Sequence, residues 1–207
     1  MMYEISVMKK LILLFLGAMM MASGYAANEA VIKGLKANNA SYKNIVCDFD
    51  QVKHIKISDN AVETAGKLYY QGECMSMIYT KPDGEFFKIT DTNINMVAGK
   101  VKINKKLSAN SPFKMLRDLL IFSMKGDIKA LETLTESTPE YKSGADVHEF
   151  TFASKGKAAK GYNKVVLKYS KKNNALIYME LHQPNGNYTT YTLKNLKFSV
   201  AIPNGVF

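Results

Sequence analysis

The 207-residue chain has no tryptophan and only two cysteines, and it lacks the short motifs of common enzymes. It has no Gly-x-Ser-x-Gly, no phosphate-binding glycine loop and no Cys-x-x-Cys. Its three histidines, His54, His148 and His182, fall in separate predicted strands without metal-ligand spacing. We therefore expect no metal, no cofactor and no catalytic residues, with histidines that are exposed or half-buried.

The scarcity of cysteine also limits disulfide chemistry. An exported protein can form disulfides, but the strand pattern places Cys47 and Cys74 two strands apart and on opposite faces. That arrangement is incompatible with the Cβ spacing of a disulfide. We predict that Cys47 is free and shielded from solvent.

The N-terminus has the three parts of a secretory signal peptide. Met8-Lys9-Lys10 gives a basic start, Leu11–Ala22 an apolar run, and Gly24-Tyr25-Ala26 a small-x-small cleavage site. The apolar run is short for a bilayer span, so an uncleaved anchor is the less favoured alternative. We expect residues 1–26 to be removed, with Met8 as the true start, and residues 27–207 to form one domain.

The chain is strongly basic, with a formal net charge of +10. A basic chain can bind nucleic acid, but an exported protein rarely meets it, so we expect no nucleic-acid partner. The lysines are scattered along the sequence. They indicate either a solvated basic surface or attraction to anionic headgroups or acidic proteins.

Period-two alternation dominates what is present. In the stretch Asn44–Ser58, Cys47 and Phe49 have one parity, while Asp48 and Asp50 have the other and are predicted to face water. Strands are predicted at Asn44–Ser58, Val62–Gln71, Cys74–Lys81, Glu85–Thr90, Asn93–Lys102, Val147–Ser154, Tyr162–Ser170, Ala175–Gln183 and Asn187–Val200. Turn residues separate them, which is typical of an antiparallel meander that curls into a barrel or partial barrel.

Helical periodicity occurs at two places. Asn28–Ala40 reads as a short amphipathic helix. In the middle of the chain, Ser111-Pro112 is a helix start and Gly126 a helix end. The apolar stripe between them is unusually wide for a surface helix. A shorter helix is predicted at Asp127–Leu134, and a basic, glycine-containing loop at Lys155–Gly161.

The chain is also rich in methionine. Six methionines occupy apolar positions: Met75, Met77, Met96, Met115, Met124 and Met179. Methionine is adaptable and is favoured on surfaces that accept ligands of varied shape, although it also fills ordinary cores. Composition alone leaves both interpretations open.

An ordered set of motifs resembles a known family. These are Phe49-x-Gln51, Gly66-Lys-Leu-Tyr-Tyr70, Met77-Ile-Tyr-Thr-Lys-Pro82, Pro184-Asn-Gly-Asn-Tyr-Thr189, Leu193-Lys-Asn-Leu-Lys197 and Ile202-Pro-Asn-Gly-Val-Phe207. In this order they resemble the LolA family, the periplasmic carriers of outer-membrane lipoproteins. The resemblance covers nearly all of the predicted mature chain.

The resemblance implies an α+β fold that is mainly antiparallel β. It implies an unclosed half-barrel of about nine to eleven strands, with a helical lid inserted mid-chain. The implied protein is a periplasmic carrier or chaperone, not an enzyme, and holds lipoprotein acyl chains in an apolar cavity. Its implied partners are an inner-membrane lipoprotein-releasing transporter and an outer-membrane acceptor, and we expect a monomer.

Strand parity selects the predicted lining of this lipid cavity. The lining residues are Phe49, Leu68, Tyr70, Met75, Met77, Tyr79, Phe87, Ile89, Met96, Val165, Leu167, Tyr169 and Met179. The predicted lid residues are Phe113, Met115, Leu116, Leu119, Leu120 and Phe122.

One departure from the family pattern concerns the lid. Well-studied carriers have an arginine before a proline between the second and third strands, where it hydrogen-bonds the lid. Here Gln71-Gly72-Glu73 takes that place. A sensor or interaction module of the same fold, without transport, is therefore an alternative, and an enzyme of unknown type is a third hypothesis.

Overall fold

The computed structural model describes residues 28–108, 111–154 and 161–207. The predicted signal peptide and residues 155–160 of the predicted basic loop lie outside these ranges. The chain divides into two units, Met1–Gly34 and Leu35–Phe207. A helix runs through residues 28–41, and residues 28–34 are the described part of the first unit. No helix in the described ranges is both long and apolar enough to cross a membrane.

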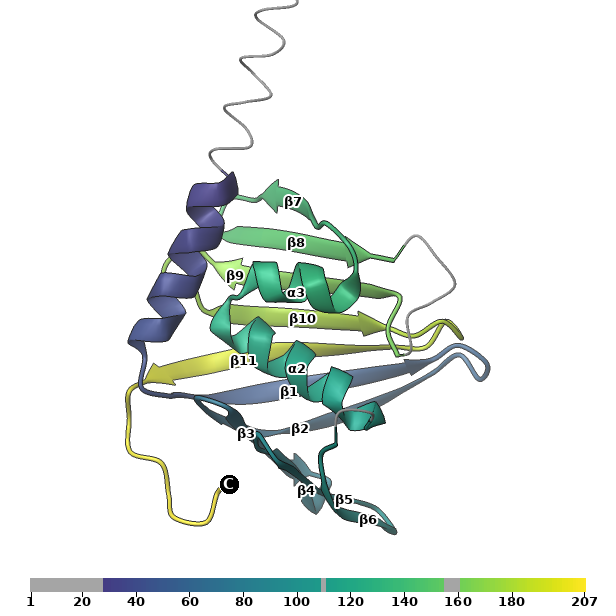
Figure 1. The fold of residues 1–207 in the computed structure, drawn as a ribbon. Helices are drawn as coiled ribbons and strands as arrows, with labels where there is room; N and C mark the ends of the chain where they lie inside the picture. The colour runs from purple at the N-terminus through teal and green to yellow at the C-terminus, as the bar shows by residue number, and fades with distance from the viewer. Residues whose placement is uncertain (1–27, 109–110, 155–160) are drawn as a thin grey trace, which may run out of the picture. The chain divides into compact units, whose positions relative to one another are not determined.

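The second unit is built on one antiparallel sheet of eleven strands (Figure 1). The strands are β1 (Ile45–Ile55), β2 (Asn60–Gln71), β3 (Cys74–Lys81), β4 (Asp83–Ile89), β5 (Asn93–Ala98), β6 (Val101–Lys106), β7 (Glu140–Ser143), β8 (Val147–Ala153), β9 (Lys164–Ser170), β10 (Leu176–His182) and β11 (Tyr188–Phe198). Their order is β6-β5-β4-β3-β2-β1-β11-β10-β9-β8-β7. Strands β6 and β7 are the two edges of the sheet and do not pair with each other, so the sheet is open and the predicted half-barrel fold is confirmed.

The first strand lies at the centre of the sheet, between β2 and β11. Cys47 pairs with Leu68, and Phe49 pairs with both Gly66 and Leu193. Cys47 and Phe49 are each 1% exposed, which confirms the buried parity of the predicted first strand. Gly66 is required there, because a Cβ atom would lie 2.2 Å from the carbonyl oxygen of Ile78.

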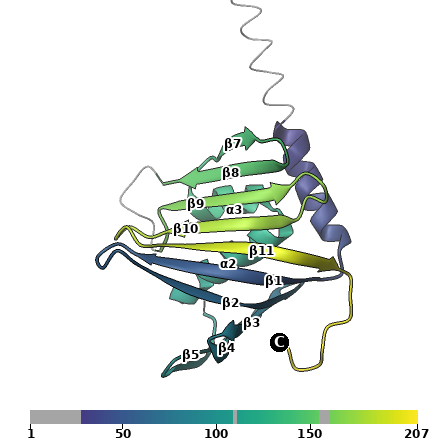
Figure 2. The same cartoon turned by 180° about the vertical axis from the view of Figure 1, so that it is seen from behind.

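Two helices cover the inner face of the sheet (Figure 1). Helix α2 (Pro112–Lys125) begins where Ser111 accepts a hydrogen bond from the amide of Phe113, and it ends at Gly126 in the left-handed conformation. Both helix ends are as predicted. Helix α3 (Ile128–Thr135) follows and is capped by Asp127. The predicted helical insert therefore forms, and in the view from behind α2 and α3 lie on the far side of the sheet (Figure 2).

One strand prediction is wrong in extent, and one strand was missed. The predicted strand Asn93–Lys102 is two strands, because Gly99 adopts a positive φ of 55° and reverses the chain between β5 and β6. The Glu85 carboxylate accepts the Gly99 amide and supports this turn. Strand β7 was not predicted, since its four residues, Glu-Tyr-Lys-Ser, show too little alternation to be recognised.

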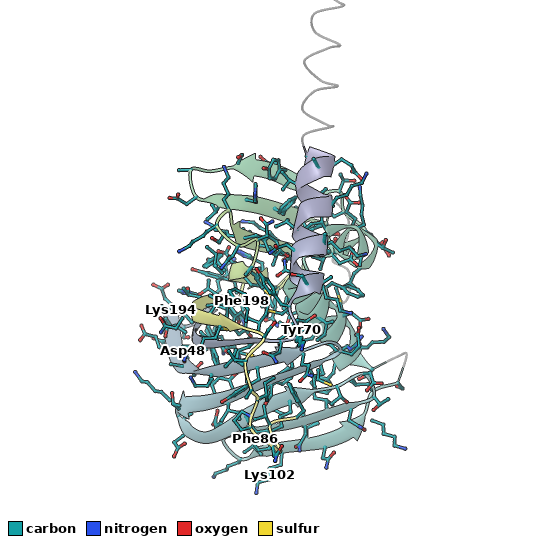
Figure 3. All side chains as sticks on the ribbon, turned by 90° about the vertical axis from the view of Figure 1, so that its left-hand side faces the viewer. Asp48, Tyr70, Phe86, Lys102, Lys194 and Phe198 are labelled. Carbon is teal, nitrogen blue, oxygen red and sulfur yellow. The ribbon has the colours of Figure 1, made fainter. Side chains whose placement is uncertain are left out.

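The outer face of the sheet carries paired charges. Asp48 accepts hydrogen bonds from Lys67 and Asn195, and Asp50 pairs with Lys194. Figure 3 shows Asp48 and Lys194 together on this face. The prediction that both aspartates lie on the wet face is confirmed.

The two cysteines are free. Cys47 lies on the inner face of the sheet. Cys74 is the first residue of β3, where it pairs with Gln71, and its parity is opposite to that of the inward-facing Met75 and Met77. Burial, with a smaller contribution from Asp48, raises the pKa of the Cys47 thiol to about 12. Cys47 is therefore a neutral, shielded side chain, as predicted.

Candidate functional site

A cavity of about 260 Å³ lies under the first turns of α2. Its floor is the inner face of β1 to β5 and β11, and its roof is the helix. Apolar side chains make up most of the wall, and the lining residues are Gln51, Thr64, Met77, Tyr79, Glu85, Phe86, Phe87, Met96, Val97, Ala98, Phe113, Leu116, Leu120 and Tyr191. An apolar wall with few polar groups is the usual composition of a site for an apolar ligand.

The polar atoms of the wall are neutral or already bonded. The Tyr79 hydroxyl donates to Oε1 of Gln51 at 3.0 Å, and the Tyr79 ring packs edge-on against Phe49. Burial, reinforced by Glu85, raises the pKa of Tyr79 to about 12, so the phenol stays protonated at neutral pH. The hydroxyl of Thr64 is buried and has no hydrogen-bond partner among the described residues. The Thr64 hydroxyl is thus an unsatisfied polar group in the wall of the apolar cavity.

A second, much smaller cavity of about 10 Å³ continues under the helix. It has room for about one water molecule, and its wall is too apolar to hold one. Met77, Leu120 and Tyr191 line both cavities, while Met75, Met124 and Met179 line the small one. We call the boundary between the two cavities, formed by Met77, Leu120 and Tyr191, the seam. Methionine side chains change rotamer at low cost, so the seam can widen and join the two cavities.

The structure separates the thirteen predicted cavity residues into three groups. Four line the larger cavity: Met77, Tyr79, Phe87 and Met96. Three more line the small cavity: Leu68, Met75 and Met179. The other six are buried in the core outside both linings: Phe49, Tyr70, Ile89, Val165, Leu167 and Tyr169. Eleven of the thirteen are buried, and Tyr79 and Met96 are half-buried. Parity did not show which of these positions border empty space.

The lid residues separate in the same way. Phe113, Leu116 and Leu120 line the larger cavity. Leu119 is fully buried, while Met115 and Phe122 are half-buried and lie outside the lining. The cavity therefore lies under the N-terminal half of α2.

Sequence reasoning missed several lining residues. Tyr191 and Leu193 alternate in β11, so parity within that strand could have identified them. Gln51 and Thr64 were passed over because they are polar. Phe86 and Val97 are cross-strand partners whose parity is opposite to that of the predicted lining residues Phe87 and Met96. The alternation pattern therefore excluded them from the predicted lining.

Helix α2 is tied to the sheet at two points. The Tyr169 hydroxyl, on β9, donates to the carbonyl oxygen of Ser123 at 2.9 Å in the buried core. Glu73, in the β2–β3 turn, forms ion pairs with Arg117 and Lys125. The turn that lacks the family's Arg-Pro pair therefore still contacts the lid, through a carboxylate on the turn and cations on the helix.

The charges around Arg117 stabilise each other. Arg117 also contacts Asp118 at 2.8 Å, and both side chains are largely buried. Burial opposes ionisation of Glu73, but hydrogen bonds and charge from Lys125 and Arg117 outweigh it and lower the pKa of that carboxyl. The Glu73 side chain is 45% exposed, so solvent screens this attachment and keeps it weak.

The histidines lie away from the cavity. His54 and His182 both stack on Tyr188 on the outer face, and His182 contacts Glu180. His148 is bonded to the Tyr141 hydroxyl, and burial with Lys171 lowers its pKa. The sequence did not show that His54 and His182 share Tyr188 as a stacking partner. Across the described ranges, no group of three or more His, Cys, Asp or Glu side chains is placed to hold a metal ion.

Comparison with known proteins finds likeness in structure alone. No protein-family model and no curated protein matches the chain. The chain is similar to a LolA superfamily protein from Nitrosomonas europaea, at 10% identity over 86% of this chain and 96% of that chain, with a TM-score of 0.42. It is similar to a DUF1329 family protein from Desulfovibrio piger, at 14% identity over 85% and 95% of the two chains, with a TM-score of 0.47.

A third similar structure is lipoprotein LppX from Mycobacterium tuberculosis, at 8% identity over 84% of this chain and 96% of that chain, with a TM-score of 0.45. LolA-like proteins, which the sequence motifs resemble, are thus among the structural neighbours of this chain. Its fold class is defined by its own strand order, and likenesses at these TM-scores carry no argument about its activity.

Proposed function

We propose that this protein is an exported, LolA-like carrier that holds acyl chains of lipoproteins in the cavity under α2 and passes them on. The observation that carries the proposal is the apolar cavity of about 260 Å³ between the lid helix and the inner face of the sheet. The family resemblance supplies the kind of cargo, and the predicted signal peptide supplies export. The transporter and acceptor implied by the resemblance complete the proposed route.

The energetics suit reversible binding. Each methylene that leaves water contributes about 0.8 kcal/mol, so ten methylenes contribute about 8 kcal/mol before the costs of binding. The cavity is close to the lower limit of ordinary ligand pockets, about 300 Å³. Widening the seam at Met77 and Leu120 would let a longer chain enter the small cavity. The exposed ion pairs of Glu73 hold the lid by about 1 kcal/mol or less, so they do not prevent opening.

Native mass spectrometry of the protein purified from a lipid-containing cell extract tests for cargo. We expect a bound acylated lipid or lipoprotein. Failure to recover any lipid under every extraction condition would overturn the proposal.

Titration with an environment-sensitive fluorescent fatty acid tests the location. We expect Leu116→Gln to weaken binding by about tenfold or more, because a polar amide would replace an apolar wall. Leu134→Gln on α3 is the matched control, since Leu134 is also a half-buried helical leucine but lies outside the lining. Equal affinities for the two variants would place the ligand elsewhere.

A binding or sensing module without transport is the second candidate. The carboxylate at Glu73, in place of the family's latch arginine, favours it because the lid attachment has a different chemistry. Transfer kinetics separate the two. A carrier loaded with fluorescent fatty acid loses it to acceptor vesicles within minutes, whereas a sensor retains it while its affinity in solution is unchanged.

A further inference from the structure

The cavity borders one end of the sheet, where the turns β1–β2, β3–β4 and β5–β6 all lie (Figures 1 and 2). In an antiparallel meander, alternate turns fall at the same end. Glu85 and Ala98, which lie next to the last two of these turns, line the cavity together with Phe113 from the first turn of α2. The hairpin β5–β6, residues 93–106, is therefore both the edge of the sheet and the rim of the cavity.

This end of the sheet carries unusual exposed apolar side chains. Ile57 is 99% exposed at the β1–β2 turn, and Val62 nearby in β2 is 47% exposed. Val101 is 53% exposed at the start of β6. Ile57 is almost fully exposed and Val101 about half exposed, so these hairpin tips leave apolar surface open to an outside partner.

All charged residues of the β5–β6 hairpin are basic. Residues 93–106 contain four lysines, Lys100, Lys102, Lys105 and Lys106, and no aspartate or glutamate. All four are exposed, and none has an ion-pair partner within the described ranges. Figure 3 shows Lys102 at the far edge of the sheet. By contrast, three lysines on other strands, Lys67, Lys168 and Lys194, each pair with a carboxylate.

We propose that the β5–β6 hairpin docks on the surface of an anionic phospholipid bilayer. Its lysines would contact the headgroups, Val101 would enter the interfacial layer, and Ile57 of the neighbouring turn would add a second apolar contact. Unpaired lysines beside exposed aliphatic residues are the combination that holds proteins at such a surface. Docking there brings the cavity rim to the lipid. The inference goes beyond acyl binding and does not depend on which cargo the cavity holds.

Co-sedimentation with vesicles tests the charge. The probe is an equimolar phosphatidylcholine–phosphatidylglycerol vesicle, with pure phosphatidylcholine as reference. Each lysine near such a surface contributes about fivefold to affinity, so we expect Lys100→Glu with Lys102→Glu to weaken binding by at least about thirtyfold. The control is Lys43→Glu with Lys172→Glu, the same charge change on exposed lysines at the opposite end of the sheet. The control should retain near-normal binding apart from the effect of net charge.

A single-tryptophan reporter tests insertion, because the natural chain has none. We expect Val101→Trp emission to shift to the blue on anionic vesicles and Lys172→Trp emission to stay unchanged. Equal vesicle binding by both lysine pairs, or no binding of the natural chain to anionic vesicles, would overturn the proposal. The hairpin lysines would then serve only to keep an edge strand from pairing with other chains. Fatty-acid titration without vesicles reports on the cavity alone, so failure of docking and failure of the carrier role are distinguishable.

Discussion

The two halves of the sheet present their inner faces to the same helix but use the space differently. Under the C-terminal half of α2 and under α3, strands β8 to β10 supply side chains that are almost fully buried: Phe150, Phe152, Val165, Leu167, Tyr169 and Leu176. Under the N-terminal half of α2, strands β2 to β5 leave the larger cavity. One half is thus a filled core that anchors the helix, and the other is a hollow that the same helix covers. A lid fixed at one end can open without unfolding the domain.

The largest difference in stability between the two halves should come from replacing one phenylalanine on the filled side and one on the hollow side with alanine. Phe150→Ala should lower the free energy of unfolding by about 3–5 kcal/mol, because it opens a void in close-packed surroundings. Phe113→Ala should cost about 1 kcal/mol or less, because Phe113 is half-buried and already borders empty space. Urea denaturation measures both. Similar losses for the two variants would mean that the halves are packed alike.

The anchor of the helix gives an intermediate effect. Tyr169→Phe removes the hydroxyl that bonds the Ser123 carbonyl and should destabilise the protein by about 1–2 kcal/mol. Hydrogen exchange should show faster exchange of the amides in the C-terminal half of α2. Tyr69→Phe, on the half-buried outer face, is the control and should change stability by less than about 0.5 kcal/mol. An unchanged α2 in the Tyr169 variant would show that the anchor lies elsewhere.

The smallest change in stability is expected for a substitution in the β2–β3 turn. Glu73→Gln should destabilise by about 0.5–1 kcal/mol, because the ion pairs with Arg117 and Lys125 are partly exposed. The folded-state pKa of Glu73 lies below its ordinary value of 4.5, so the contribution is present above that pH. It is lost as the pH falls through the lower folded-state pKa.

Stability measured against pH for Glu73→Gln and the natural chain should therefore converge in acid. Glu63→Gln, an exposed glutamate of β2, is the control and should show little difference at any pH. A difference that persists below the folded-state pKa would show that Glu73 acts through packing and not through charge.

Much of the fold could be predicted from particular residues. Alternation in β1 correctly gave the buried side of Cys47 and Phe49, and Ser111 and Gly126 gave both ends of α2. The failures have local causes. The turn at Gly99 depends on a single glycine inside a continuous strand-like pattern, and β7 is four residues long and forms by pairing with β8.

The site was less predictable than the fold, because a cavity is a property of distance between elements. Leu167 and Met96 have equivalent inward parity, yet Leu167 is fully buried in the core and Met96 borders the hollow. The difference depends on which side chains pack over each strand, and parity within one strand does not show that. Likewise, the sequence shows that Gln71-Gly72-Glu73 lacks an arginine, but only the structure shows that Glu73 pairs with Arg117, which is 44 residues away.

The sequence by itself determined the antiparallel strands, the buried parity of β1 and the boundaries of the wide apolar helix. These follow from period-two and period-3.6 patterns and from capping residues, which act over a few neighbours along the chain. The tertiary structure alone decided that one half of the sheet is filled and the other hollow, and that the lid is held by a carboxylate on the turn. Those features depend on contacts between segments far apart in sequence, where packing and charge pairing are set by the fold as a whole.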